Sequence, residues 1–199
     1  MLSYNKLMKK QNTREKLLDI TFEEIYINGY AATSVDAILK GAAVPKGSMY
    51  HHFRSKKELV LAMVKERLFP KMDQFFNLDA SSGCALESLE RLFIAMSKNT
   101  PLITYGCPMY RLMVELSPVD SDFDKLFRGK YKQLVKSFDR LLQKDIKQGL
   151  IKDTLNTKEF AGFVIHSTWG VLSLSPTLSS AQRFLRDTDF ILEILRNYY

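Results

Sequence analysis

The sequence predicts an all-α fold, and three observations carry this prediction. Apolar residues recur at spacings of three and four along nearly every segment longer than ten residues, as on one face of a helix. Helix-capping residues and helix-ending Gly or Pro stand at the borders of these segments. No stretch alternates as a strand for more than a few residues, although the apolar run 162–165 is ambiguous by itself.

The composition describes a globular chain with an excess of positive charge near its start. The 199 residues are 46% apolar, enough to bury a core in one large domain or two small ones. Residues 1–60 carry ten Lys and Arg against six Asp and Glu, or +4 of the net charge of +7. This excess indicates an anionic partner without distinguishing nucleic acid from a membrane.

Cysteine content and hydropathy bear on the cellular compartment. Cys84 and Cys107 are too few for a secreted disulfide framework and lack the spacing of a metal site. The N-terminal residues contain no apolar segment of signal-peptide length, and no apolar run approaches the roughly 20 residues of a membrane span. We therefore expect a soluble, cytoplasmic protein with no cofactor, no metal and no membrane partner.

Three short helices are expected at the start of the chain. The apolar periodicity predicts the first helix over 13–28, ending at Gly29. Either Thr33 or Ser34 can cap the second helix. Pro45 suits the first turn of the third, because its missing N–H would be unpaired there in any case.

Longer helices are expected in the rest of the chain. Ser55 can cap a fourth helix, in which Pro70 should introduce a kink or a break. A polar segment at 79–83 can join two helices, and Thr157 can cap a later one. Apolar stripes mark the inner faces of the later helices: Leu86, Leu89, Phe93 and Met96; Phe123, Phe127, Leu134, Phe138, Leu141 and Leu142; and Phe184, Ile191 and Leu195.

The segment AAVPKGSMYHHF, residues 42–53, ends in two adjacent histidines. Adjacent residues on a helix point about 100° apart, whereas two chelating histidines need a separation of three or four. No third metal ligand lies nearby in the sequence, and an acid–base pair would need a positioned partner and a cleft. The histidines are therefore either solvated residues of a surface helix or part of a surface that contacts an anion.

The layout around this segment is that of a helix-turn-helix, whose second helix enters the major groove of DNA. Residues 46–48 fall in the first turn of the third predicted helix, where free backbone N–H groups attract phosphate. Met49 and Phe53, four apart, can face inward. Residues 50–52 then project along the flanks, where they can reach phosphate oxygens, as can Lys56 in the next helix.

Residues 29–59, GYAATSVDAILKGAAVPKGSMYHHFRSKKEL, resemble the DNA-binding domain of the TetR family of bacterial transcriptional regulators. The pattern of the family runs Gly-Tyr, Thr-Ser/Thr-Val, Ile, Ala-Gly-Val-Ser, Lys-Gly, then Tyr-x-His-Phe and Lys. Three positions depart from it: Ala43 stands at a usual Gly, Pro45 at a capping Ser and Glu24 at a Leu. A positive φ at Ala43 would cost about 1 kcal/mol, so either the turn is built differently or Ala43 does not need that conformation.

The resemblance implies a helix-turn-helix domain at 1–54 and an effector-binding and dimerisation domain at 55–199. The protein would be a DNA-binding transcriptional regulator, and specifically a repressor that a small-molecule effector of unknown identity releases from its operator. A homodimer would read a double-stranded, palindromic or pseudo-palindromic operator through two recognition helices. Its interface would be the last two helices, 157–175 and 181–197. The alternative is that their apolar residues are intramolecular core: Phe163, Trp169, Ile191 and Leu195.

The family roles can be carried over position by position. Lys46 and Gly47 would approach base edges or nearby phosphates, and Ser48 would be the polar reader beside them. The remaining contacts would be to the DNA backbone, from Thr33, Tyr50, His51, His52 and Lys56.

By the same resemblance, part of the core of the larger domain encloses an effector pocket. Most of the candidate lining residues are aromatic or Met side chains, for which packing in the core is the alternative. The candidates are Phe93, Met96, Tyr105, Met109, Arg111, Met113, Phe138, His166 and Trp169.

Two other functions remain open from the sequence. Cys84 and Cys107 fall at predicted helix starts, where thiolates are favoured, and could form a redox switch. The protein could also be a DNA-bound, partner-recruiting protein without an effector. An enzyme is not expected, because the sequence contains no catalytic nucleophile–base pair, phosphate loop or metal cluster.

Overall fold

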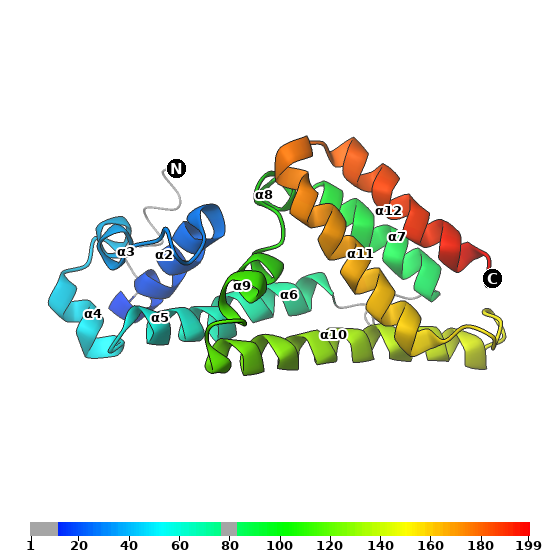
Figure 1. Ribbon diagram of the computed structural model, residues 1–199, viewed down its shortest axis with the longest axis horizontal. Helices are drawn as coiled ribbons and strands as arrows, with labels where there is room; N and C mark the ends of the chain where they lie inside the picture. The colour runs from blue at the N-terminus through cyan, green and yellow to red at the C-terminus, as the bar shows by residue number, and fades with distance from the viewer. Residues whose placement is uncertain (1–11, 77–82) are drawn as a thin grey trace. The chain divides into compact units, whose positions relative to one another are not determined.

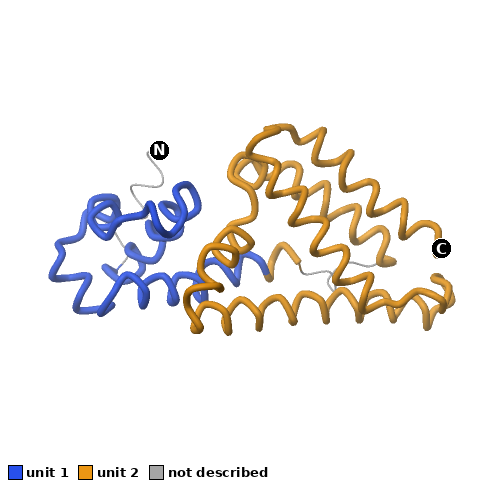
Figure 2. The backbone as a smooth tube through the Cα atoms, in the orientation of Figure 1, with its two compact units in different colours: residues 1–72 blue, residues 73–199 orange. Residues whose placement is uncertain are grey.

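A computed structural model describes residues 12–76 and 83–199, and within these ranges it contains helices and no strand (Figure 1). The predicted all-α fold is confirmed. The chain divides into two compact units, residues 1–72 and 73–199 (Figure 2). The expected boundary after residue 54 lies inside the first unit, because the helix that follows it packs against the first described helix.

The first unit buries one face of each of its short helices. Ser34 accepts the N–H of Ala37 at 3.0 Å and is therefore the cap of the second helix, one of the two expected alternatives. The core side chains of this unit include Leu17, Leu18, Ile25, Ile38, Met49 and Leu59. Its helices are α2 (Thr13–Asn28), α3 (Val35–Ala42), α4 (Lys46–His52), α5 (Lys56–Met63) and η1 (Val64–Leu68), followed by α6 (Phe69–Phe75), which crosses into the second unit.

The expected break at Pro70 does not occur, since α5, η1 and α6 follow one another with helical backbone at both junctions. The segment η1 is a π-helix, and its wider turn directly precedes α6. Pro70 has no N–H to give to the carbonyl of Glu66. That carbonyl instead accepts a hydrogen bond from the Arg67 guanidinium at 3.2 Å. The π turn and this bond together accommodate the proline.

Two guanidinium groups join η1 to α2. Arg14 donates to both carboxylate oxygens of Glu66, at 2.7 and 2.5 Å. Arg67 donates to Asp19 at 2.5 Å and also to Glu15. The hydrogen bond from Arg14 holds the pKa of Glu66 below its ordinary value.

The second unit packs its four longest helices around one core, with α10 against α11 and α7 against α12 (Figure 1). Large buried side chains from all four helices fill it: Phe93, Phe123, Phe127, Phe138, Leu142, Trp169, Leu172, Phe184 and Leu195. Beyond α6, the helices are α7 (Ala85–Ser97), α8 (Thr100–Tyr105), α9 (Pro108–Leu116), α10 (Ser121–Lys147), α11 (Thr157–Leu178) and α12 (Ala181–Arg196).

Two details of the second unit differ from expectation. Asn156, not Thr157, caps α11, while the Thr157 hydroxyl donates to Asp139 at 2.6 Å. The helix α11 also continues past residue 175 and contains Pro176. Of the expected connecting segment 79–83, all but the last residue lies outside the described residues.

A buried carboxylate holds three segments of the second unit together. Asp145, on α10, is 0% exposed. Its Oδ2 accepts the N–H of Ala85 and the hydroxyl of Tyr199, each at 2.6 Å. Cys84, the N-cap of α7, provides no side-chain cap, so Asp145 satisfies this helix end from a distant part of the sequence. The other oxygen, Oδ1, is buried without a hydrogen-bond partner among the described residues.

Candidate DNA-binding and effector-binding sites

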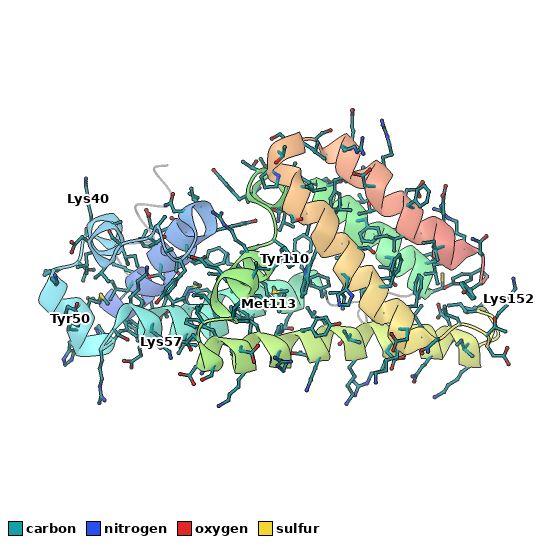
Figure 3. The ribbon with its side chains drawn as sticks, viewed as in Figure 1. Lys40, Tyr50, Lys57, Tyr110, Met113 and Lys152 are labelled. Carbon is teal, nitrogen blue, oxygen red and sulfur yellow. The ribbon has the colours of Figure 1, made fainter. Side chains whose placement is uncertain are left out.

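The helix α4 has one buried and one exposed face. Met49 is fully buried, and Phe53, directly after the helix, is 3% exposed. These two side chains fix the helix against the rest of the first unit, as expected from their spacing of four. Figure 3 labels Tyr50, which is 47% exposed. The other predicted DNA contacts exposed on α4 are Lys46, Gly47, His51 and His52, and Ser48 is half-buried.

The tip of α4 has features that the first unit itself does not require. A Cβ added at Gly47 would meet no atom within 4 Å, so packing inside the unit does not explain a glycine there. The ammonium of Lys46 lies 4.0 Å from the Asp36 carboxylate, and both side chains are mostly exposed. A pair of this kind is weak in water and leaves Lys46 available to an anion.

The turn before α4 shows whether Ala43 adopts a positive φ, which the sequence left open. Ala43 is left-handed, with φ 53° and ψ 46°. Its N–H donates to Lys40 at 3.2 Å, and the N–H of Val44 donates to Leu39 at 3.0 Å, which closes the end of α3. Ala43 therefore does adopt the positive φ that glycine tolerates better.

Two residues that were predicted to contact the DNA backbone already have hydrogen-bond partners within the protein. Thr33 is 1% exposed, and its hydroxyl donates to the Gly29 carbonyl at 2.7 Å. The predicted phosphate contact of Thr33 does not fit this burial. Lys56 donates to the Tyr30 carbonyl and lies 4.0 Å from the centre of the Tyr30 ring. It would have to exchange these partners to reach a phosphate.

The two histidines at the end of α4 contact each other edge to face, with ring centres 5.3 Å apart. Both are exposed. Within the described ranges, no group of three or more His, Cys, Asp or Glu side chains is placed to hold a metal ion. The geometry leaves both imidazoles facing solvent.

Three helices of the second unit, α9, α10 and α11, line a cavity of about 540 Å³, which we call the aromatic cavity. The sequence predicted three of its lining residues, Met113, His166 and Trp169. Figure 3 labels Tyr110 and Met113, which come from α9. The complete lining is Tyr110, Met113, Ser117, Asp124, Arg128, Tyr131, His166 and Trp169.

A second cavity, of about 650 Å³, lies between α10 and α11, and we call it the lysine cavity. It shares Tyr131 and His166 with the aromatic cavity, so the two cavities adjoin. Its lining is Tyr131, Lys132, Val135, Lys136, Asp139, Lys158, Glu159, Gly162, Phe163 and His166.

The other predicted pocket residues lie elsewhere in the second unit. Phe93 packs edge to face against Phe184 and lines a separate cavity of about 390 Å³ between α7 and α12. Tyr105 and Arg111 line none of these three cavities. The remaining predicted pocket residues are core side chains that are at most 2% exposed: Met96, Met109 and Phe138.

Sequence reasoning missed the contribution of α10 to the aromatic cavity. Asp124, Arg128 and Tyr131 are spaced by four and three, so they lie on one face of this helix. That spacing is visible in the sequence. Which face of α10 meets α9 and α11 is not.

The structure does not favour a thiolate at Cys107. Its side chain is 8% exposed, and this burial raises the pKa of the thiol. A buried thiol with a raised pKa is a poor nucleophile, so the redox alternative loses its chemical basis at this position. Cys84 is half-buried, and both cysteines are free thiols.

Comparisons with known proteins agree with this architecture. Residues 17–63 match the family model described as bacterial regulatory proteins, tetR family. An uncharacterized HTH-type transcriptional regulator in the lacX 3' region of Lactococcus lactis subsp. lactis is 33% identical over 147 residues, covering 70% of this chain and 75% of that protein. The HTH-type transcriptional repressor DhaR from Mycobacterium sp. (strain GP1) is 28% identical, covering 83% of each chain.

Solved structures share the fold. A TetR transcriptional regulator from Chloroflexus aurantiacus J-10-FL superposes with a TM-score of 0.83 at 21% identity, covering 94% of this chain and 95% of that one. The fold and these relatives define a DNA-binding transcriptional regulator with a helix-turn-helix, not an enzyme. The chain belongs to the TetR family. Within the described residues, none of the helices combines the length and apolarity needed to traverse a bilayer.

Proposed function

We propose that this protein is a transcriptional repressor that binds operator DNA through α4 and leaves it when a small molecule binds the second unit. The observation that carries the proposal is the exposed face of α4, held in place by buried Met49 and Phe53. Relatives such as DhaR are named as repressors. Since its target would be chromosomal DNA, we also propose that it acts in the cytoplasm.

At the DNA, Ser48 would read base edges in the major groove, and Lys46 and Gly47 beside it would approach base edges or nearby phosphates. The flanking contacts to phosphate would come from Tyr50, His51, His52 and, after exchange of its present partner, Lys56. Gly47 offers a sharp test, because its Cβ position is empty. Alanine there should stabilise the free protein, by up to about 1 kcal/mol, yet weaken DNA binding by obstructing the approach of the backbone to DNA.

The first experiment is selection of bound DNA from a random pool, followed by a screen for compounds that release the selected DNA. Ser48→Ala should alter the preferred sequence, whereas Lys46→Ala should weaken binding to every sequence. Selection that yields no enriched DNA would overturn the proposal. So would equal behaviour of the Ser48 and Lys46 variants on all sequences.

One recognition helix reads only a few base pairs, so we propose a homodimer that spaces two of them about 34 Å apart. Leu174, Leu178 and Phe190, on α11 and α12, are 59%, 46% and 70% exposed and could form its interface. The alternative was that the apolar residues of these helices lie only in the core of one chain. It fits Trp169, Ile191 and Leu195, which are buried, but not Phe163, which is 39% exposed. Sedimentation of a monomer at micromolar concentration would contradict the dimer.

A further inference from the structure

The aromatic and lysine cavities meet at one pair of side chains. The hydroxyl of Tyr131, on α10, lies 2.7 Å from Nε2 of His166, on α11. Their rings are within 9° of parallel, with centres 5.6 Å apart. Both side chains line both cavities. The two cavities therefore adjoin at this pair, and a ligand that spans both would contact it.

Besides the Asp124–Arg128 ion pair, the aromatic cavity is lined by side chains that suit a flat, apolar group. The indole of Trp169 lies 5.7 Å from the ring of Tyr110 and 6.0 Å from that of Tyr131, measured between centres. Met113 adds a polarisable side chain that adapts to ligand shape. Aromatic rings at these separations favour a planar ligand by offset or edge contacts. The Ser117 hydroxyl oxygen is buried with no hydrogen-bond partner among the described residues, so a ligand polar atom could satisfy it.

The lysine cavity suits an anion. Lys132, Lys136 and Lys158 line it, and no ion pair is found for any of them within the described chain. Two carboxylates also line it. Asp139 already accepts the Thr157 hydroxyl at 2.6 Å and the Gln143 amide at 3.1 Å, and Glu159 lies in the first turn of α11. The cations outnumber the carboxylates, and one carboxylate is already hydrogen-bonded.

We propose that the two cavities form one site for a small molecule with a planar aromatic body and an anionic group. The body lies against Tyr110 and Trp169, and the anion lies near Lys132, Lys136 and Lys158, across the Tyr131–His166 pair. This inference rests on the proposed function, in that the effector binds the second unit. It adds the chemical class of the effector.

Trp169 provides the readout, because it is the only tryptophan in the chain and lines the aromatic cavity. Two dyes with the same aromatic body serve as probes: 1-anilinonaphthalene-8-sulfonate, which carries an anion, and N-phenyl-1-naphthylamine, which does not. Both should quench Trp169 emission on titration into the full chain. The sulfonate should bind more tightly, and its advantage should fall with added salt.

The variant Lys132→Gln/Lys136→Gln/Lys158→Gln should bind the sulfonate about tenfold more weakly than the native protein. Its affinity for the neutral dye should not change, which also shows that the variant is folded. The matched control is Lys125→Gln/Lys144→Gln/Lys147→Gln, which removes three exposed lysines of α10 that do not line the cavity. Equal affinity of the native protein for both dyes would overturn the inference, as would an equal effect of the two lysine variants.

The two proposals fail in different ways. Binding to selected DNA is measured on the protein without dye. If the protein binds DNA but the sulfonate does not quench Trp169 preferentially, only the proposed ligand class is overturned. Preferential quenching in a protein that binds no DNA overturns the proposed function and leaves the ligand class standing.

Discussion

Among the turns with a positive φ, one in each unit can be compared, because a different residue type adopts that conformation in each. In the first unit the residue is Ala43, with φ 53°, between α3 and α4. In the second unit it is Gly106, with φ 78°, between α8 and α9. A Cβ at Gly106 would lie 2.9 Å from the carbonyl oxygen of Leu172 on α11. The first turn carries local strain that a substitution can relieve, whereas tertiary packing against α11 fixes the second.

The largest effect that this comparison predicts is at Gly106. Gly106→Ala should lower the free energy of unfolding by about 3 kcal/mol, because the backbone conformation (φ 78°, ψ −170°) is essentially restricted to glycine and the new Cβ meets backbone. Urea unfolding followed by Trp169 emission measures it. Gly47→Ala is the control, since its Cβ meets nothing. Equal stability of the two alanine variants would show that α11 does not constrain this turn.

A smaller loss of unfolding free energy is expected when the buried carboxylate of Asp145, in the second unit, is removed. Asp145→Ala leaves the N–H of Ala85 and the hydroxyl of Tyr199 without their acceptor, which should cost about 2 kcal/mol of unfolding free energy. Tyr199→Phe removes one of these bonds and should cost less than Asp145→Ala. Calorimetric unfolding of both variants checks this order. A reversed order would mean that Asp145 is not the group that holds the C-terminus.

Ala43→Gly should raise the free energy of unfolding, whereas Gly106→Ala and Asp145→Ala should lower it. Glycine adopts the left-handed conformation without the steric cost that alanine has, so the first unit should gain about 1 kcal/mol of unfolding free energy. Thermal unfolding by circular dichroism measures the gain. A decrease in stability would show that the strain at this turn is outweighed by the entropy of glycine in the unfolded chain.

The smallest effect is expected at the exposed ion pair of the first unit. The bond from Arg14 lowers the pKa of Glu66, so the stabilisation is present above the ordinary value of 4.5 and is lost as the pH falls through the folded pKa. At neutral pH, Glu66→Gln should cost about 0.5 kcal/mol, because both side chains are more than a third exposed. Stability curves of variant and native protein should converge at acidic pH; a constant gap would exclude this linkage.

The first unit could be predicted in detail because its signals are local. The helix bounds 13–28, the cap at Ser55 and the choice of Thr33 or Ser34 as the second cap follow from residues next to the backbone groups concerned. The continuation of the helix through Pro70 was not predicted, because the π turn and the Arg67 bond that accommodate the proline are not visible as a local pattern. The burial of Thr33 was missed for the same reason, since its hydroxyl bonds back to the end of α2.

For the second unit, the sequence predicted that the segments are helices but not how the helices pack. Its cavities combine side chains from α9, α10 and α11, and no local pattern shows which faces of these helices meet. His166 and Trp169 were predicted because they are polar or aromatic within an apolar helix. Tyr131, which joins the two cavities, gave no such signal. Met109 and Phe138 look the same in sequence and are core.

The central claim is that the exposed face of α4 binds DNA, and the salt dependence of affinity tests it most directly. Selected DNA should be titrated into the native protein and into Lys46→Ala/Tyr50→Ala at several salt concentrations. We predict that the variant binds at least about tenfold more weakly and that its dependence of log affinity on log salt is shallower by about one unit. Identical affinities and slopes for the two proteins would contradict the claim.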